Sequence, residues 1–126
     1  MANCFRRLQE AHTLAAAEEI KGKAAGSQRA SYHGAIVVTK DATAVAVNVT
    51  AVDHRSPEHH AEIRAMAKVP PSSLVGATIY VARSCVGKWG DSRPCSSCDR
   101  AIRKAGVKRV IYTNSGNIMG VLTYHH

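Results

Sequence analysis

Two short motifs constrain the fold of this chain more than any other feature: H-A-E at residues 60–62 and P-C-S-S-C at residues 94–98. Cys95 and Cys98 are three residues apart, so on a helix both sulfurs face one side of the first turn. The histidine and glutamate of the first motif are two residues apart and diverge inside a regular helix. They share a site only if the histidine lies at the first position of its helix. If both motifs serve one site, the fold must bring two helix N-termini together.

The C-x-x-C spacing alone leaves four interpretations open. A redox dithiol opens a helix directly after a strand, whereas the expected loop at 84–93 precedes this pair. Half of a structural zinc site needs two further ligands at matching spacing, and Cys4 and Cys85 offer no second C-x-x-C. The pair also suits two ligands of a catalytic metal. Chance remains the fourth interpretation.

Adding His60 to the cysteine pair favours a catalytic metal. Three protein ligands and one open position are typical of catalytic Zn²⁺, whereas structural zinc sites close with four ligands. A helix N-terminus stabilises the thiolate form that metal binding requires. Glu62 then lies beside the metal without binding it. It can take a proton from zinc-bound water, whose pKa falls to about 7.

Composition limits the class of protein. A chain of 126 residues predicts a single domain, 1–126, and its hydrophobic (45%) and charged (21%) fractions are ordinary for a globular protein. No apolar run approaches the ~18 residues of a membrane span, and the N-terminus lacks the apolar block of a signal peptide. We therefore expect no membrane partner and a cytoplasmic location with reduced thiols. The net charge of +8 favours anionic partners, such as nucleotides, nucleic acid or acidic surfaces.

Periodicity and turn residues predict the element order α-β-β-α-β-α-β-β. Strands separated by helices indicate a partly parallel sheet covered by helices. The link before the last strand is too short for a crossover, so that strand should be antiparallel to its neighbour. Loops are expected at 21–29, 53–58 and 84–93. The expected helices are 3–21, 60–68 and 95–105, and the expected strands are 33–40, 43–50, 77–83, 107–113 and 118–124.

The paired motifs H-x-E and P-C-x-x-C resemble the signature of the zinc-dependent cytidine deaminase superfamily. HGAIVV with the hairpin into VAVNV resembles the first two strands of that family. GDSRPCSSCDRAIRKAGVKRVIYT resembles its third helix and fourth strand. The resemblance covers residues 32–113. It implies a three-layer αβα fold with a five-stranded mixed sheet.

The resemblance also implies a reaction. Zinc held by His60, Cys95 and Cys98 would provide a hydroxide that attacks C4 of cytosine. Glu62 would protonate N3 and then the leaving amine, so that ammonia departs and uracil remains. Pro94 suits the first turn of the helix that presents both cysteines, because its φ is fixed and it lacks an N–H.

Six residues are candidates for substrate contact. The backbone N–H of Ala61 would face the ring, and Asn48 matches an asparagine that holds the sugar hydroxyl; alternatively Asn48 is a solvated strand end. Trp89 either stacks on a base or packs its loop. The full set is Asn48, Ala61, His33 at the pocket mouth, Trp89, and Ser92 with Arg93 bordering the substrate.

The family traits leave the substrate open. Histidine at position 60 resembles deoxycytidylate, tRNA adenosine and polynucleotide deaminases, whereas free-nucleoside enzymes usually have cysteine there. The short hairpin after Thr113 resembles the branch that includes free-nucleoside enzymes. A cytosine nucleoside or nucleotide such as dCMP is the leading substrate. The alternatives are unpaired cytosine or adenine in a single-stranded nucleic acid, and a silent zinc domain that only binds nucleic acid or a partner. The resemblance implies a homo-oligomer.

Overall fold

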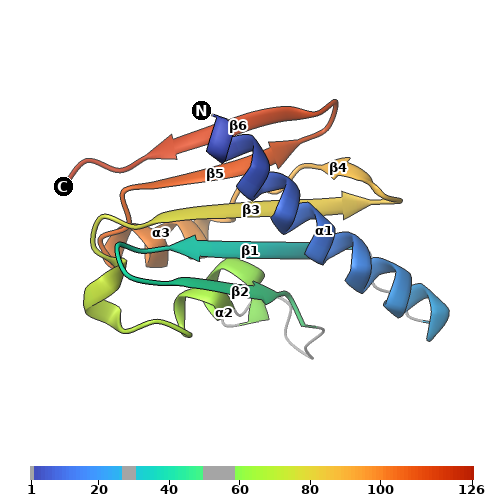
Figure 1. Ribbon diagram of the computed structural model, residues 1–126, viewed down its shortest axis with the longest axis horizontal. Helices are drawn as coiled ribbons and strands as arrows, with labels where there is room; N and C mark the ends of the chain where they lie inside the picture. The colour runs from blue at the N-terminus through green and yellow to red at the C-terminus, as the bar shows by residue number, and fades with distance from the viewer. Residues whose placement is uncertain (1, 27–30, 50–58) are drawn as a thin grey trace.

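The computed structural model describes residues 2–26, 31–49 and 59–126, and these form one six-stranded sheet with helices on both faces (Figure 1). The expected loop at 53–58 and positions 27–29 of the loop at 21–29 lie outside the described residues. The elements in chain order are α1 (Ala2–Ala24), β1 (Tyr32–Val38), β2 (Thr43–Val47), α2 (Ala61–Met66), the 3-10 helix η2 (Pro71–Leu74), β3 (Thr78–Cys85), β4 (Lys88–Gly90), α3 (Ser96–Lys104), β5 (Arg109–Asn114) and β6 (Ile118–Thr123).

The strands follow the spatial order β2-β1-β3-β5-β6. Among the described strands only the β3–β5 pairing is parallel, and β6 runs antiparallel to β5, which confirms the mixed sheet and the direction of the last strand. A sixth strand was not expected. The predicted loop at 84–93 contains the end of β3 and all of β4, which pair antiparallel. Val86 and Gly87 turn the chain between them with φ of 53° and 78°, a conformation that glycine favours.

The three-layer αβα arrangement is confirmed. α1 covers one face of the sheet, where Leu8 and Ala11 pack with Ile36 and Tyr80. α1 approaches β1 so closely that a Cβ on Gly34 would lie 2.3 Å from the backbone oxygen of Ala11, so glycine is required there. α2 and α3 cover the other face, which Figure 1 shows behind the strands.

The helix boundaries differ from the expected ones by a few residues. α1 continues to Ala24, three residues beyond the predicted end at 21. α2 is shorter than 60–68: it begins at Ala61 and ends at Met66. The chain cannot continue it far because Pro70 and Pro71 follow and disfavour helix. Gly106 has a φ of 88° just after α3, as predicted for a residue that ends a helix. No helix among the described residues has the length and apolar character needed to cross a membrane.

Candidate metal centre

The structure brings three potential ligands together on the α2/α3 face of the sheet. Nδ1 of His60 lies 2.9 Å from Sγ of Cys98 and 3.7 Å from Sγ of Cys95. All three ligand atoms lie within 4.8 Å of one another, and no other such group of three occurs in the described ranges. Sequence reasoning grouped the same three residues.

Two helix starts produce this convergence. His60 is the residue before α2 and Cys95 the residue before α3, and both have extended backbones, with ψ of 148° and 166°. Neither side chain forms a hydrogen bond that caps its helix. Cys98 comes from the first turn of α3. His60 therefore precedes its helix and does not open it, which still lets its side chain meet the cysteines.

Pro94 has a different role from the predicted one. It precedes Cys95 and lies outside α3, so the prediction that it occupies the first helical turn is wrong. Its ring instead disfavours helix at Arg93. The chain thus arrives at α3 extended, and the helix starts only after the first cysteine.

The donor set fits Zn²⁺. One imidazole nitrogen and two thiolate sulfurs are ligands that zinc prefers, and three of them leave the fourth tetrahedral position open. Cys98 is fully buried. Burial, then the carboxylate of Glu62 and then Cys95, raise the pKa of the Cys98 thiol. A divalent cation would reverse this balance, because a metal stabilises the thiolate and the thiol proton is released on binding.

Glu62 is the second residue of α2 and is 6% exposed. Burial raises the pKa of its carboxyl, and a hydrogen bond from its own backbone N–H and the charge of His60 oppose that rise in part. A carboxyl with a raised pKa can hold a proton nearer neutral pH than a free glutamate, as a residue that accepts and returns protons requires. Ala61 lies between His60 and Glu62 and is fully buried.

Asn48 and His33 lie together where β1 begins. The Asn48 side chain accepts a hydrogen bond from the His33 backbone N–H at 2.9 Å and donates one to the Ser31 carbonyl at 3.0 Å. Side chains alternate along a strand, so His33 shares the face of β1 with Ala35, which packs in the same core as Cys98. His33 therefore faces the metal side of the sheet.

Ser92 has a structural role in place of the expected substrate contact. It is 3% exposed, and its hydroxyl lies 2.9 Å from the Val81 carbonyl, the Thr113 hydroxyl and the Thr113 N–H. These partners use the whole hydrogen-bonding capacity of a serine hydroxyl. Ser92 therefore ties the segment before α3 to β3 and β5. Arg93 next to it is exposed, and its guanidinium reaches the Tyr112 hydroxyl at 3.4 Å.

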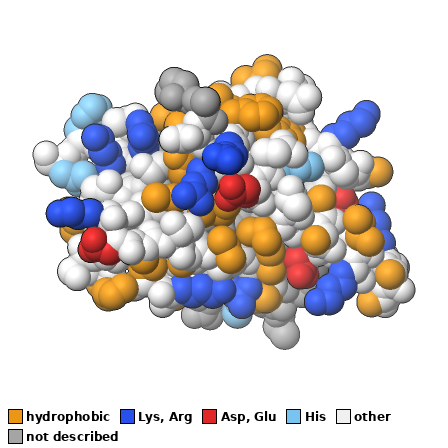
Figure 2. Space-filling model, viewed as in Figure 1, with side chains coloured by type: hydrophobic (Ala, Val, Ile, Leu, Met, Phe, Trp, Pro, Cys, Tyr) orange, Lys and Arg blue, Asp and Glu red, His pale blue; other side chains and the backbone are white. Residues whose placement is uncertain are grey.

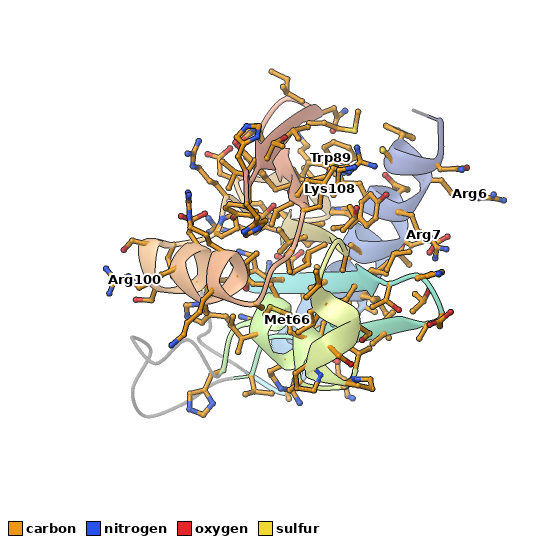
Figure 3. All side chains as sticks on the ribbon, turned by 90° about the vertical axis from the view of Figure 1, so that its left-hand side faces the viewer. Arg6, Arg7, Met66, Trp89, Arg100 and Lys108 are labelled. Atoms are coloured by element: carbon orange, nitrogen blue, oxygen red, sulfur yellow. The ribbon has the colours of Figure 1, made fainter. Side chains whose placement is uncertain are left out.

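Trp89 lies on the opposite face of the sheet from the metal centre. Its ring centroid is 5.7 Å from that of Phe5, and its Nε1 donates to Gln9 at 3.3 Å. Figure 3 shows Trp89 toward α1, with Arg100 of α3 on the other side of the sheet. The structure does not bring Trp89 to the ligands, and of the two predicted roles the packing role fits its position.

Sequence reasoning missed two residues that fix a turn and a helix through long-range contacts. Glu19 accepts hydrogen bonds from the Ser84 hydroxyl and from the N–H groups of Val86 and Gly87, and thereby fixes the β3–β4 turn. The Tyr124 hydroxyl donates to Asp99 in the first turn of α3 at 2.6 Å. Neither contact has a local sequence signal, because each joins residues far apart in the chain.

The comparisons agree with this geometry. The family model described as cytidine and deoxycytidylate deaminase zinc-binding region matches residues 7–114. That range includes Glu62 and all three clustered ligands, and it exceeds half of the chain. A search of curated proteins gave no match. On the family match and the His-Cys-Cys cluster, the chain belongs to the cytidine and deoxycytidylate deaminase family and has a zinc-binding centre.

Proposed function

We propose that this chain is a hydrolytic deaminase that converts a cytosine nucleoside or nucleotide to its uracil form and releases ammonia. One observation carries the proposal. A buried carboxyl, Glu62, whose pKa is raised, lies two residues after a ligand in a three-ligand centre that fits zinc. A domain that only bound zinc would gain nothing from burying a proton carrier there, because burying a carboxyl away from water destabilises the fold.

The chemistry divides between the metal and the chain. Zinc bound by His60, Cys95 and Cys98 would supply a Lewis acid and, at neutral pH, a nucleophile for C4 of the ring. Glu62 carries the protons: it delivers one to N3 and a second to the exocyclic amine. One water is consumed, the C4–N bond breaks, a C4=O bond forms and ammonia leaves. The Ala61 N–H, among the first of α2 and without a partner within the helix, orients the ring.

Three residues support a nucleotide over a free nucleoside. His33 faces the metal side of the sheet, and Arg83 is its cross-strand neighbour in β3. Arg93 precedes the cysteine motif and is exposed. Arg83 and Arg93 would offer positive charge to a 5′-phosphate, with His33 beside them as a hydrogen-bonding group, and the net charge of +8 acts in the same direction. Asn48 remains our candidate for the sugar hydroxyl. dCMP is therefore the preferred substrate.

A polynucleotide substrate is the second candidate, and one surface favours it. The solvent side of α3 carries Arg100, Arg103 and Lys104, all exposed, on the helix that also provides Cys98. Such a surface would attract the phosphates of a single strand. Against it, Trp89, the only tryptophan in the sequence, is packed under α1, and the exposed Phe5 lies beside it on that face and not on the α3 side.

An ammonia-release assay over a panel of substrates tests the proposal. We expect turnover with dCMP, less with cytidine, and none with single-stranded DNA or RNA containing cytosine. Turnover of the oligonucleotides alone would support the polynucleotide alternative. Zinc binding without turnover on any member, or on the same oligonucleotides containing adenine, would support the silent binding domain. All four cysteines are free thiols, which suits the reducing cytoplasm that we propose as the location.

A further inference from the structure

The two edges of the sheet are finished in different ways. At the β2 edge, α2 and the residues after it cover the outward carbonyls. Nζ of Lys68 donates to the Val45 carbonyl at 2.6 Å, and the Arg64 guanidinium donates to the Val47 carbonyl. The Val49 N–H, also outward, donates to the His59 carbonyl. A second strand cannot add to this edge without displacing two cations.

The β6 edge has no such cover among the described residues. The Tyr124 N–H donates to the Lys108 carbonyl, and backbone groups alternate in direction along a strand. The backbone groups of residues 118, 120 and 122 therefore point toward β5. Those of Met119, Val121 and Thr123 point outward, away from the sheet. No described residue bonds to those outward groups. The side chains of Met119 and Val121 are 37% and 52% exposed. Figure 1 shows β6 as the outermost strand on its side of the sheet.

The composition of β6 makes this edge unusual for the chain. Its six residues, IMGVLT, include no charge and no proline. Lysine, proline and bulges are the devices that normally keep an edge strand from pairing. The molecule carries a net charge of +8, and Figure 2 shows Lys and Arg side chains at several places on one face, so two copies repel each other through their charged surfaces. An uncharged strand is a place where two copies can approach.

We propose that β6 pairs antiparallel with β6 of a second copy about a two-fold axis, which joins two sheets into one. Such an interface is isologous, so each copy offers the same outward groups of Met119, Val121 and Thr123 to the other. The exposed Val121 side chains then become cross-strand neighbours near the middle of the pair. The proposal assigns β6 as the interface of the expected homo-oligomer, and it does not depend on the deaminase function.

A concentration series tests the proposal, with mass measured by sedimentation or light scattering. We expect the wild type to shift from monomer to dimer as concentration rises. Val121→Lys would place two charges opposite each other, so association should weaken by at least about ten-fold. Val45→Lys is the matched control, because Val45 is 43% exposed on the edge that is already covered. That variant should associate like the wild type.

Hydrogen exchange gives an independent measurement. The amides of Met119, Val121 and Thr123 should be protected in the dimer and exchange freely in Val121→Lys. A monomer at every concentration would overturn the proposal, as would a Val45→Lys variant that weakens association equally or a dimer that leaves these amides unprotected. If Val121→Lys does not fold, Met119→Lys on the same face replaces it. Glu62→Gln should dimerise normally, so failure of the catalytic proposal is distinguished from failure of this one.

Discussion

Nδ1 of His60 lies 2.9 Å from Sγ of Cys98 although the two residues are 38 positions apart. One comes from the residue before α2 and the other from the first turn of α3. The contacts between the two helices are few compared with those that α2 makes to β1 and β2. A metal at this point would therefore join two elements that the polypeptide itself joins weakly.

Zinc should accordingly stabilise the fold. A ligand that binds only the native state at a hundred times its Kd contributes about 2.7 kcal/mol. For a domain of this size, that corresponds to a rise in Tm of roughly 10 °C. Differential scanning fluorimetry with zinc and with a chelator measures it. Cys95→Ser should abolish the zinc-dependent rise, whereas Cys85→Ser, which is also exposed but lies outside the cluster, should keep it. Equal loss in both variants would contradict the assigned ligands.

Glu62→Gln should lose activity and keep zinc. The amide has nearly the same shape but cannot carry a proton, so kcat/KM with dCMP should fall by about 10²–10⁴-fold. Zinc content, measured by mass spectrometry of the purified protein, should stay near one per chain. Glu10→Gln, an exposed glutamate on α1, is the matched control and should leave both values unchanged. Normal turnover by Glu62→Gln would rule out its role as proton carrier.

The ligand cluster was predictable because each motif spans the start of a helix, and the geometry of a helix start is local. The order of the expected helices and strands was predictable because hydrophobic periodicity is also a local property of the sequence. Trp89 shows where this reasoning ends. It belongs to a strand of three residues, β4, whose register against β3 decides which face each side chain takes. Three residues carry no readable alternation, so the sequence could not place Trp89 toward α1.

Ser92 and Glu19 show a second limit. A serine beside a catalytic motif and a glutamate on a helix both suggest solvent or substrate contact. Ser92 instead forms hydrogen bonds with Val81 and Thr113 on two strands. Glu19 accepts hydrogen bonds from a turn more than sixty positions away in the chain. Such contacts depend on how the layers pack, and no short-range pattern encodes them.

Glu19→Gln should destabilise the protein, and the loss should depend on pH. Burial raises the pKa of the Glu19 carboxyl, but hydrogen bonds from Val86, Gly87 and Ser84, with the charge of Lys23, outweigh burial and lower it overall. A lowered pKa means that the stabilisation is present above the ordinary value of about 4.3 and is lost as pH falls through the lower folded value. Removing a charged acceptor should cost about 1–3 kcal/mol at neutral pH.

Urea denaturation between neutral and acidic pH measures this effect. The difference in unfolding free energy between wild type and Glu19→Gln should shrink as Glu19 is protonated. Glu18→Gln, the neighbouring and more exposed glutamate, provides the control and should show no such convergence. A difference that stays constant with pH would mean that the charge of Glu19 does not hold the β3–β4 turn.

Tyr124 should stabilise α3 through its neutral hydroxyl. It is 5% exposed and donates to Asp99 at 2.6 Å, and the Arg103 guanidinium lies 5.1 Å from its ring centroid. Burial, then the hydrogen bond to Asp99 and its charge, raise the pKa of Tyr124, while Arg103 and Arg93 oppose the rise in part. A raised pKa means that the stabilisation is present below the ordinary value of about 10 and is lost as pH rises through the higher folded value.

Tyr124→Phe keeps the ring and removes the hydroxyl, so it should lower the free energy of unfolding by about 1–3 kcal/mol at neutral pH. Above about pH 10 the wild-type advantage should shrink, because the unfolded tyrosine ionises while the folded one does not. Thermal unfolding of both proteins across this range measures the difference directly, and ionisation of other groups cancels in the comparison. Because Asp99 follows Cys98 in α3, Tyr124→Phe should also weaken zinc binding slightly. If stability falls and zinc affinity is unchanged, Tyr124 stabilises the packing of residue 124 on α3 and has no effect on the metal centre.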